Sequence, residues 1–346
     1  MEALVLDPTR LPRPEQLIGA VIVEEVNANG RRVFHKGHRL TAEDLQILQT
    51  VDRPVHAVRL APTDVHEDEA SLRLARAIAG PGLDQKGPRQ SRINLIAAHK
   101  GLLRIDAATL HRLNCLPGVA IFTLLDRLSV LPGTVVAGVK IAPVAIDRTI
   151  IEEAEAIAAA AGPVIQVKAF RPLKVGVIST EGLEGRVRDR FRETVTRKIG
   201  WYGGTVLGFA DLPNDASQVA EAIERFIAEG ADLILTGGGN TIDPLDAALQ
   251  ALPRIGAEIV SFGVASHPGS MLWLAYRGDV PIFNLASCSM YSKSTSADLI
   301  LPWIMAGERV TTEDIASIGH GGLLERGMDF RFPPYDAEQA PQDEGE

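Results

Sequence analysis

Residues 231–249 read ADLILTGGGNTIDPLDAAL, and this stretch is the most informative one about the C-terminal half of the chain. Asp232–Thr236 reads as a buried strand, three glycines follow it, and Asp243 with Pro244 is expected to cap and open a helix. Glycine lets the backbone come close to a ligand, and a helix N-terminus offers free N–H groups to an anion. The stretch therefore predicts a turn that binds a phosphate-like group. The alternative is a tight, well-capped turn without a ligand.

The sequence around this turn alternates strands with helices. Helices are expected over 187–199 and 215–227, and the predicted strands are 173–180, 204–212, 258–264, 271–277 and 281–286. This alternation predicts a parallel α/β sheet. Because ligands bind beyond the carboxyl ends of such strands, one edge should gather Ser179-Thr180, Asn214-Asp215, the Gly237 turn and His267-Pro268-Gly269.

Two acids follow the glycines, Asp243 and Asp246, and at this spacing they would share one face of the first helical turn. Paired carboxylates there suit Mg²⁺. Alternatively, they only complement the helix dipole, which favours acids in the first turn. Asp243 is the stronger metal candidate, and Asp246 is the more ordinary dipole partner.

The first 170 residues show short strands and fewer helices. Gly19–Val23 reads as a strand, Val55–Leu60 as an edge strand, and Thr41 with Asp44 gives a capping-box signal for a helix. Further along we expect a helix over Asp64–Ala79 and long strands over Val119–Leu128 and Thr134–Ile146. We therefore predict a small β/α module at 1–60, a β-rich middle region at 61–170, an α/β domain at 171–310 and an extension at 311–346. The acidic end of that extension is expected to be disordered.

A basic stretch, KGPRQSRINLIAAHKGLLRID, opens the middle region of an otherwise acidic chain. One hypothesis makes Arg89, Arg92 and Lys100 a clamp for a phosphorylated ligand. The other makes the stretch a solvated helix face followed by a loop.

Composition limits the class of protein. The chain has 346 residues and a net charge of −9, which argues for several domains and against nucleic acid as the main partner. Its two cysteines, Cys115 and Cys288, are far apart and fit a reduced compartment. No signal peptide, membrane-spanning run, P-loop, dinucleotide fingerprint or G-x-S-x-G elbow occurs in the sequence. We expect a cytoplasmic protein that contacts neither nucleic acid nor membrane.

Several of these motifs together resemble one family. The strand VGVIST, Asn214-Asp215 before a helix, TGGGNTIDPLDA and the later HPGSM are similar to the molybdopterin-binding (MoaB/Mog) domain, over roughly residues 172–307. That domain occurs in molybdopterin adenylyltransferases and in molybdotransferases of the MoeA type. The β-rich modules upstream resemble the MoeA arrangement without its C-terminal β-barrel. Where the family usually has an LPGNP-like segment, this chain has Asn284-Leu285-Ala286-Ser287-Cys288.

The resemblance implies a fold, a ligand and a site. The fold is α/β, a parallel or mixed MoaB/Mog-like sheet preceded by a β-rich α+β region. The ligand is molybdopterin, a pterin dithiolene phosphate, with Mg²⁺ held by Asp215 and Asp243 if phosphoryl chemistry takes place. The residues expected to bind substrate are Ser179, Thr180, Thr236, Gly237, Gly238, Gly239, Asn240, Thr241, Pro268, Gly269 and Ser270.

The resemblance leaves the activity open. One hypothesis is an enzyme of molybdenum cofactor maturation, with Asp243 and Asp215 as catalytic residues, that adenylylates molybdopterin or inserts molybdenum. Another is a non-catalytic molybdopterin carrier or sensor, which the altered LPGNP-like segment favours. A third is another phosphate-ligand enzyme on the same sheet. The family's habit of sharing sites between subunits implies a homo-oligomer, most simply a dimer, and a molybdoenzyme or another cofactor-biosynthesis protein as partner.

Overall fold

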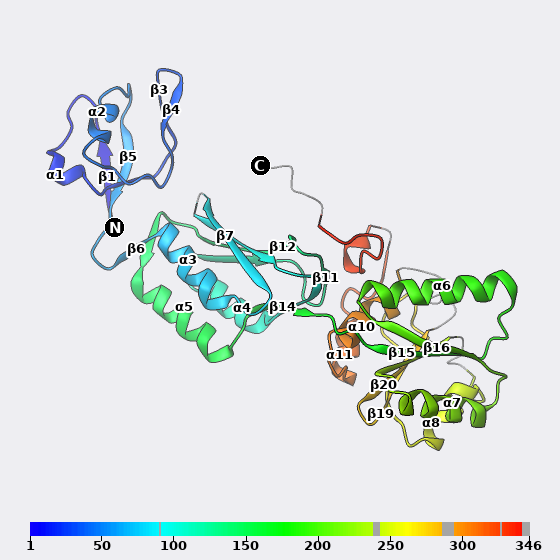
Figure 1. Cartoon of the computed structure of the whole chain (residues 1–346). Coiled ribbons are helices and arrows are strands. Elements are labelled where there is room, and N and C mark those ends of the chain that lie inside the picture. Colours follow the sequence, from blue (N-terminus) through cyan, green and yellow to red (C-terminus); the bar gives the residue numbers. More distant parts are fainter. Residues whose placement is uncertain (90, 238–242, 286–293, 326, 341–346) are drawn as a thin grey trace.

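The computed structural model describes residues 1–89, 91–237, 243–285, 294–325 and 327–340. Three folded parts follow one another along the molecule, in the order of the sequence (Figure 1). We call them the N-terminal module, the middle domain and the C-terminal domain. Their sheets lie within 2–59, 64–169 and 174–285 respectively.

The N-terminal module is a small β structure around its own core. Its elements are β1 (Glu2–Leu6), α1 (Pro14–Leu17), β2 (Val21–Ile22), β3 (Val26–Ala28), β4 (Arg31–Phe34), α2 (Asp44–Leu48) and β5 (Val55–Arg59). The strand order β1-β5-β2 makes β5 the central strand, so the expectation of an edge strand there is wrong. Asp44 accepts hydrogen bonds from Thr41 N at 2.8 Å and Thr41 Oγ1 at 2.9 Å, as the capping-box signal predicts.

The middle domain packs three helices against small antiparallel sheets. Its elements are β6 (Asp64–His66), α3 (Glu67–Ile78), β7 (Leu83–Arg89), β8 (Arg92–Ala97), β9 (Gly101–Ile105), α4 (Ala107–Asn114), β10 (Val119–Thr123), β11 (Ser129–Val130), β12 (Val135–Ile141), β13 (Ala145–Asp147), α5 (Arg148–Ala161) and β14 (Ile165–Ala169). The main sheet has the order β10-β12-β8-β7, and β9 lies between β11 and β14. Arg73 of α3 makes a bidentate ion pair with Glu155 of α5: Nε donates to Oε1 at 2.8 Å and Nη2 donates to Oε2 at 2.7 Å.

The basic stretch forms strands, so its interpretation as a solvated helix face is wrong. Along β8 the buried residues are Ile93, Leu95 and Ala97, with less buried residues between them. Burial of every second residue is the period of a strand, and a helix would need a period of 3.6.

The C-terminal domain is a three-layer α/β structure. Its elements are β15 (Lys174–Ser179), α6 (Gly185–Trp201), β16 (Thr205–Asp211), α7 (Ala216–Ala228), β17 (Leu233–Gly237), α8 (Ala247–Arg254), β18 (Glu258–Phe262), β19 (Trp273–Arg277), β20 (Val280–Leu285), α10 (Ser296–Met305), α11 (Thr312–Ser317) and η1 (Asp329–Arg331). The sheet order is β16-β15-β17-β20-β19-β18. The first four are parallel and β19 runs against its neighbours. The predicted α/β class, with a β-rich α+β region before it, is confirmed.

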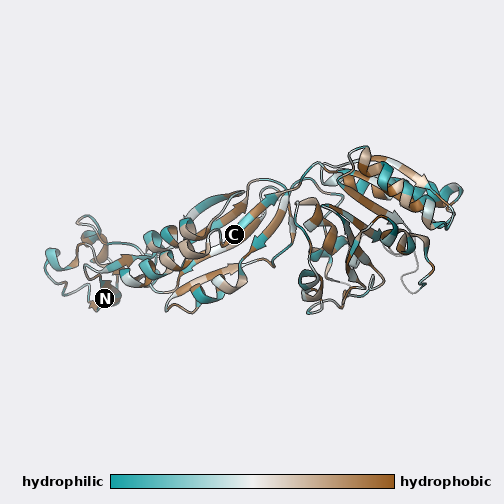
Figure 2. Ribbon diagram, turned by 90° about the horizontal axis from the view of Figure 1, so that it is seen from below, coloured by the Kyte–Doolittle hydropathy of each residue, from teal (hydrophilic) through white to brown (hydrophobic). Residues whose placement is uncertain are grey.

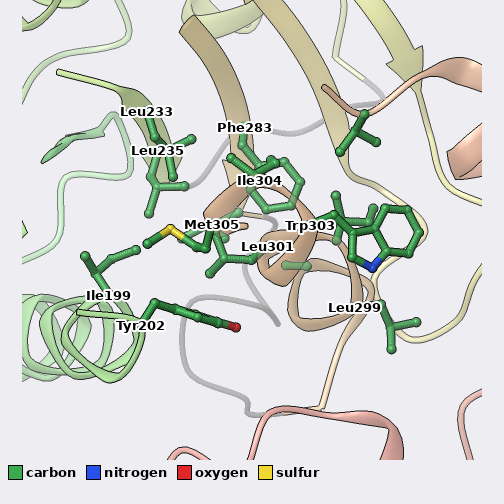
Figure 3. Close-up of a cluster of buried hydrophobic side chains, with 14 of the residues drawn as sticks. Ile199, Tyr202, Leu233, Leu235, Phe283, Leu299, Leu301, Trp303, Ile304 and Met305 are labelled. Atoms are coloured by element: carbon green, nitrogen blue, oxygen red, sulfur yellow. The ribbon is translucent and has the colours of Figure 1, made fainter. Parts of the chain in front are cut away.

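Two hydrophobic cores lie on the two faces of this sheet. Val177, Leu235 and Phe283 point to the face covered by α6 and α10, whereas Ile178 and Ile234 belong to the core under α7 and α8. Figure 2 shows hydrophobic residues concentrated along the strands, with helices that carry both kinds of residue. Figure 3 shows the first core, where Leu235, Phe283, Leu301 and Met305 lie close together. Burial of these residues from water is the main stabilising term.

The middle and C-terminal domains are joined by polar contacts. Arg104 of β9 and Lys168 of β14 both pair with Glu308, and Lys168 Nζ lies 2.8 Å from its carboxylate. Arg127 pairs with Asp314 of α11. Partly buried charge pairs are screened less by salt than exposed ones. These pairs therefore help to hold the two domains in their relative orientation.

Residues 332–340 fold back onto this joint, which differs from the disordered end that composition suggested. Tyr335 is buried, with 6% of its surface exposed. The Trp201 Nε1–H group donates to the Ala337 carbonyl at 2.9 Å, and Lys100 Nζ lies 2.9 Å from Glu338. Although the segment is acidic, its buried Tyr335 and the bond from Trp201 hold it against the folded domains.

No helix in the described parts of the chain is long and apolar enough to cross a membrane.

Candidate functional site

The carboxyl ends of the parallel strands lie on the side of the C-terminal domain away from the middle domain. The chain leaves β14 of the middle domain and enters β15 at Lys174, so the amino ends of the strands face the joint. Helix α6 runs back, and its last residue, Trp201, lies with Lys100 at the joint. The predicted ligand edge is therefore the outer edge of the domain (Figure 1).

Two buried hydroxyl groups stand at this outer edge. Ser179 ends β15, and Thr236 is the next-to-last residue of β17; only 3% of each residue is exposed. Neither Ser179 Oγ nor Thr236 Oγ1 has a hydrogen-bond partner within the part of the chain that the structure describes. Buried polar groups normally make hydrogen bonds. Two buried hydroxyls without a partner therefore mark a place where a ligand or an ordered water supplies the missing bonds.

The register of the strands places these hydroxyls close along the sheet but on opposite faces. Thr236 lies beside Ile178, and Gly237 lies beside Ser179. Side chains alternate along a strand, so Ser179 is on the α6 face and Thr236 is on the α7–α8 face. A ligand that spans the end of the sheet can contact both. Thr180 follows directly, and its N–H approaches the Gly237 carbonyl at 3.4 Å.

Gly237 is needed for packing. A Cβ atom at this position would lie 2.5 Å from the ring of Phe191 on α6. The first glycine of the turn thus lets α6 approach the strand end. Gly238, Gly239, Asn240 and Thr241 lie outside the described residues, as do Ala286, Ser287 and Cys288.

Helix α8 begins later than expected. Its N-cap is Asp246, whose Oδ1 accepts from Ala248 N at 3.0 Å and Leu249 N at 3.3 Å. The prediction that Asp243 is the cap and Pro244 the first helical residue is wrong. Asp243 instead accepts from Leu245 N at 2.9 Å, forming an exposed local turn.

The N-termini of α7 and α8 are tied together. Asp215 caps α7, accepting from Ser217 N at 2.8 Å and Gln218 N at 3.0 Å. These backbone hydrogen bonds, Gln218 first, hold the pKa of the Asp215 carboxyl below its usual value. Asn214 Oδ1 accepts from Ala247 N, the first residue of α8, at 2.8 Å. This hydrogen bond joins residues 33 positions apart, so no local sequence pattern predicts it.

Three carboxylates, Asp215, Asp243 and Asp246, therefore stand near two helix N-termini. Each accepts at least one backbone hydrogen bond through a single oxygen. Among the described residues, no group of three His, Cys, Asp or Glu side chains is arranged to hold a metal ion. The proposed Mg²⁺ ligands Asp215 and Asp243 thus remain a prediction.

The segment Pro268-Gly269-Ser270 packs on the N-terminus of α10. Ser296 N and Oγ donate to the Pro268 carbonyl at 3.1 and 3.0 Å. Gly269 has φ +107°, and a Cβ atom there would lie 2.8 Å from Ser296 N. Only glycine fits that approach. Because α10 runs back toward the joint, its N-terminus and this segment lie on the outer side.

The three residues of the hypothesised clamp are not brought to this edge. Lys100 lies at the joint, 4.7 Å from the centre of the Trp201 ring and paired with Glu338. Arg92 and Arg89 face each other at the end of the β7–β8 hairpin, and Arg92 Nε lies 2.6 Å from Asn94 Oδ1. Within one chain, Arg89 and Arg92 therefore lie in the middle domain and Lys100 lies at the joint, away from the predicted ligand edge.

Comparison with known proteins identifies the class of the C-terminal domain. Residues 174–306 match the family described as "Probable molybdopterin binding domain". A molybdopterin molybdenumtransferase of Synechococcus elongatus is 28% identical over 121 residues, which cover 32% of this chain and 30% of that protein. The chain thus spans under a third of the curated relative that it matches.

Solved structures give similar matches. The tungsten cofactor synthesizing protein MoaB from Pyrococcus furiosus is 20% identical, with a TM-score of 0.32, covering 39% of this chain and 93% of that one. A molybdopterin biosynthesis MoeA protein from Pyrococcus horikosii is 16% identical, with a TM-score of 0.32, covering 70% of this chain and 79% of that one.

The resemblance seen in the motifs is therefore confirmed. The chain carries a molybdopterin-binding domain of the MoaB/Mog type over residues 174–306. Over this domain the chain is similar to a molybdopterin molybdenumtransferase.

Proposed function

We propose that this protein binds molybdopterin at the outer edge of its six-stranded sheet and acts in the biosynthesis or insertion of the molybdenum cofactor. The observation that carries the proposal is that the buried hydroxyls Ser179 Oγ and Thr236 Oγ1, at the strand ends, have no hydrogen-bond partner among the described residues. The family match over the same domain supplies the ligand class.

The edge offers the two kinds of contact that a phosphorylated pterin needs. The N-termini of α7 and α8, joined through Asn214 and Ala247, give positive dipole ends that favour a phosphate. Ser179 and Thr236 supply hydroxyls that both donate and accept, which suits the amide and ring nitrogens of a pterin. Pro268-Gly269-Ser270, packed on the N-terminus of α10, forms a further wall.

The second candidate is a binding protein without catalysis, which carries or senses the cofactor. The observation that favours it is the use of the carboxylates: Asp215 and Asp246 both cap helices, and Asp243 closes a local turn. An enzyme that adenylylates molybdopterin or inserts molybdenum needs Mg²⁺ between a carboxylate and the phosphates, since like charges repel. Asp215 and Asp243 are both exposed, and in the printed hydrogen bonds each accepts through Oδ1, so each offers its other oxygen to a metal ion.

One experiment separates the two candidates. The full-length protein is incubated with molybdopterin alone and with molybdopterin, Mg²⁺ and ATP, and bound pterin is measured by the fluorescence of its oxidised form. Retained pterin without an adenylylated product supports a carrier, whereas a product detected by mass spectrometry supports an enzyme. No retained pterin under either condition contradicts the proposed function and leaves another phosphate ligand at this edge.

A homodimer and a molybdoenzyme or biosynthetic partner are part of the same proposal. Light scattering at micromolar protein concentration measures the first, and a monomer would count against it.

A further inference from the structure

The last described stretch of the chain, residues 334–340, crosses the joint and contacts both domains; we call it the strap. Over this stretch the backbone forms neither helix nor strand. On the side of the middle domain, Lys100 Nζ lies 2.9 Å from Glu338 Oε2. On the side of the C-terminal domain, the Trp201 Nε1–H group donates to the Ala337 carbonyl at 2.9 Å. The strap is therefore attached mainly through side chains and not through a ladder of backbone hydrogen bonds.

Tyr335 is the buried anchor of the strap. Among residues 334–340 it alone is buried, with 6% of its surface exposed. Its hydroxyl donates to Asp298 Oδ1 at 2.9 Å and lies 3.1 Å from the Tyr202 hydroxyl. Its ring stands edge-on to the Trp201 ring, with the ring centres 5.7 Å apart. A buried aromatic ring removes a large apolar area from water, so the docking of the strap depends chiefly on this one side chain.

The charged contacts of the strap are exposed to solvent. The side chain of Glu338, which pairs with Lys100, is 75% exposed. The side chain of Asp336 is 66% exposed, and its Oδ1 lies 3.3 Å from Arg197 Nη1 on α6. Ion pairs as exposed as these contribute little to stability, and salt weakens them further. One buried ring and two salt-sensitive pairs therefore hold the strap in place.

Opening of the strap leaves no unpaired charge in the core of the C-terminal domain. When Tyr335 leaves, Asp298 keeps the Lys198 ammonium group at 2.7 Å and its hydrogen bonds from Thr295 N and Oγ1. Losing one partner of a buried ion pair is costly, but this pair stays whole. The strap can therefore open locally while the domain beneath it stays folded.

The joint keeps other contacts when the strap is open. Glu308 still pairs with Arg104 and Lys168, and Asp314 still pairs with Arg127. These pairs join the same two domains as the strap does. Opening of the strap therefore widens the range of orientations at the joint without separating the domains.

We propose that the strap is a reversible clamp on the joint: it opens while both domains stay folded, and its docking selects the orientation of the middle and C-terminal domains seen here. Because two of its contacts are exposed ion pairs, higher ionic strength shifts the equilibrium toward the open strap. The inference does not depend on the proposed pterin site, which lies at the outer edge of the C-terminal domain.

Hydrogen exchange of the tryptophan indole N–H groups measures the opening in the full-length protein, by NMR of protein that carries isotopically labelled tryptophan. The Trp201 indole N–H is bound to the strap, whereas Trp273 is buried in the core under α7 and α8 and exchanges when the domain unfolds. We expect Trp201 to exchange faster than Trp273, and faster still as NaCl rises from about 0.05 to about 0.5 M. Equal exchange rates for the two indoles would mean that the strap opens only with the whole domain, which overturns the proposal.

Two variants separate the anchor from the ion pairs. Tyr335→Ala removes the buried ring, so the ratio of open to docked strap, and with it the Trp201 exchange rate, should rise by about a hundredfold or more. Glu338→Gln removes an exposed ion pair and should raise the rate by only about twofold to fivefold, while reducing the effect of salt. Glu229→Gln, which removes an exposed ion pair at the end of α7, is the matched control and should leave the rate unchanged.

Small-angle X-ray scattering tests the effect on the joint. Tyr335→Ala should have a larger radius of gyration than the wild type, because the two domains sample more orientations, while circular dichroism shows that both remain folded. Unchanged scattering from a folded Tyr335→Ala protein in which Trp201 exchanges rapidly would overturn the role of the strap in setting the orientation. Should Tyr335→Ala fail to fold, Glu338→Gln and the salt series of the wild type decide, and a Trp201 exchange rate that neither changes overturns the proposal.

Discussion

Lys198 Nζ lies 2.7 Å from Asp298 Oδ1, in a contact where the side chains of Lys198 and Asp298 are 6% and 1% exposed. The same Oδ1 accepts from the Tyr335 hydroxyl at 2.9 Å, and Oδ2 accepts from Thr295 N and Oγ1 at 3.2 and 2.9 Å. One carboxylate therefore connects α6, the N-terminus of α10 and the returning segment 332–340.

We expect this carboxylate to matter more than its cationic partner. Removing one member of a buried ion pair costs about 3–5 kcal/mol, because the other charge stays buried. Asp298→Ala also removes the capping box and the Tyr335 bond, so its cost should exceed that of Lys198→Met by about 1–3 kcal/mol. Urea denaturation of both variants measures the difference.

The control for this comparison is an exposed pair. Arg277 and Glu224 are 45% and 43% exposed, and Glu224→Gln should change the free energy of unfolding by only about 0.5 kcal/mol. Equal losses for Asp298→Ala and Lys198→Met would show that the capping and Tyr335 bonds contribute nothing.

Ser179→Ala should separate binding from stability. The hydroxyl has no partner in the described chain, so its removal should change the free energy of unfolding by less than about 1 kcal/mol. Molybdopterin affinity should fall about tenfold if the hydroxyl contacts the ligand. Fluorescence of bound, oxidised pterin measures affinity, and thermal unfolding measures stability.

A second buried serine provides the opposite pattern. Ser71 Oγ accepts from Ile141 N at 3.1 Å in the middle domain. Ser71→Ala leaves that N–H unpaired, so it should cost about 1–3 kcal/mol without changing pterin affinity. Unchanged pterin affinity in Ser179→Ala would remove this hydroxyl from the site.

The Arg127–Asp314 bridge makes the joint sensitive to acid. Burial raises the pKa of Asp314, but the hydrogen bonds from Arg127 and Thr311 outweigh burial and lower it below the ordinary value. A carboxyl whose folded pKa is lowered stabilises the protein above its unfolded pKa of about 4, and this stabilisation is lost as pH falls through the folded pKa.

Asp314→Asn should therefore destabilise the protein more at neutral pH than in acid. Urea midpoints of the wild type and the variant, measured at about pH 6.5 and about pH 3, give the comparison. A stability difference that stays the same at both pH values would show that the Asp314 charge does not stabilise the joint.

Asp243→Asn tests the choice between enzyme and carrier. Asparagine can accept the Leu245 N–H bond as aspartate does, so stability should be nearly unchanged. If the protein catalyses a Mg²⁺-dependent reaction through this residue, turnover should fall by orders of magnitude while pterin binding stays or tightens. Intact Mg²⁺-dependent turnover in the variant would leave Asp243 as a turn residue.

Much of the C-terminal domain is visible in the sequence because its signals are local. Each predicted strand from 173 to 286 overlaps an observed one. Short apolar runs between polar turns are typical of buried strands such as β15 and β17, whereas β18, at the edge of the sheet, is largely exposed. The Ser179 and Thr236 positions follow from the rule that such strands carry ligands at their carboxyl ends.

The differences come from contacts between distant residues. Helix α8 begins at Ala247 because Asn214, from the preceding loop, binds the first N–H group. Tyr335 is buried because α6 and α10 together provide Tyr202 and Asp298 as partners. Neither partner can be read from the acidic segment itself. In the basic stretch, alternation of Ile93 and Leu95 was present in the sequence, but the charges obscured it.

The returning segment 332–340 also has a consequence for the order of assembly. Ala340 N approaches the Pro132 carbonyl at 3.4 Å, and Tyr335 closes over Tyr202. These residues are synthesised after every strand of the two sheets that they join. The contacts of segment 332–340 at the joint can therefore form only after all of these strands have left the ribosome, whereas the Glu308 and Asp314 pairs can form before it.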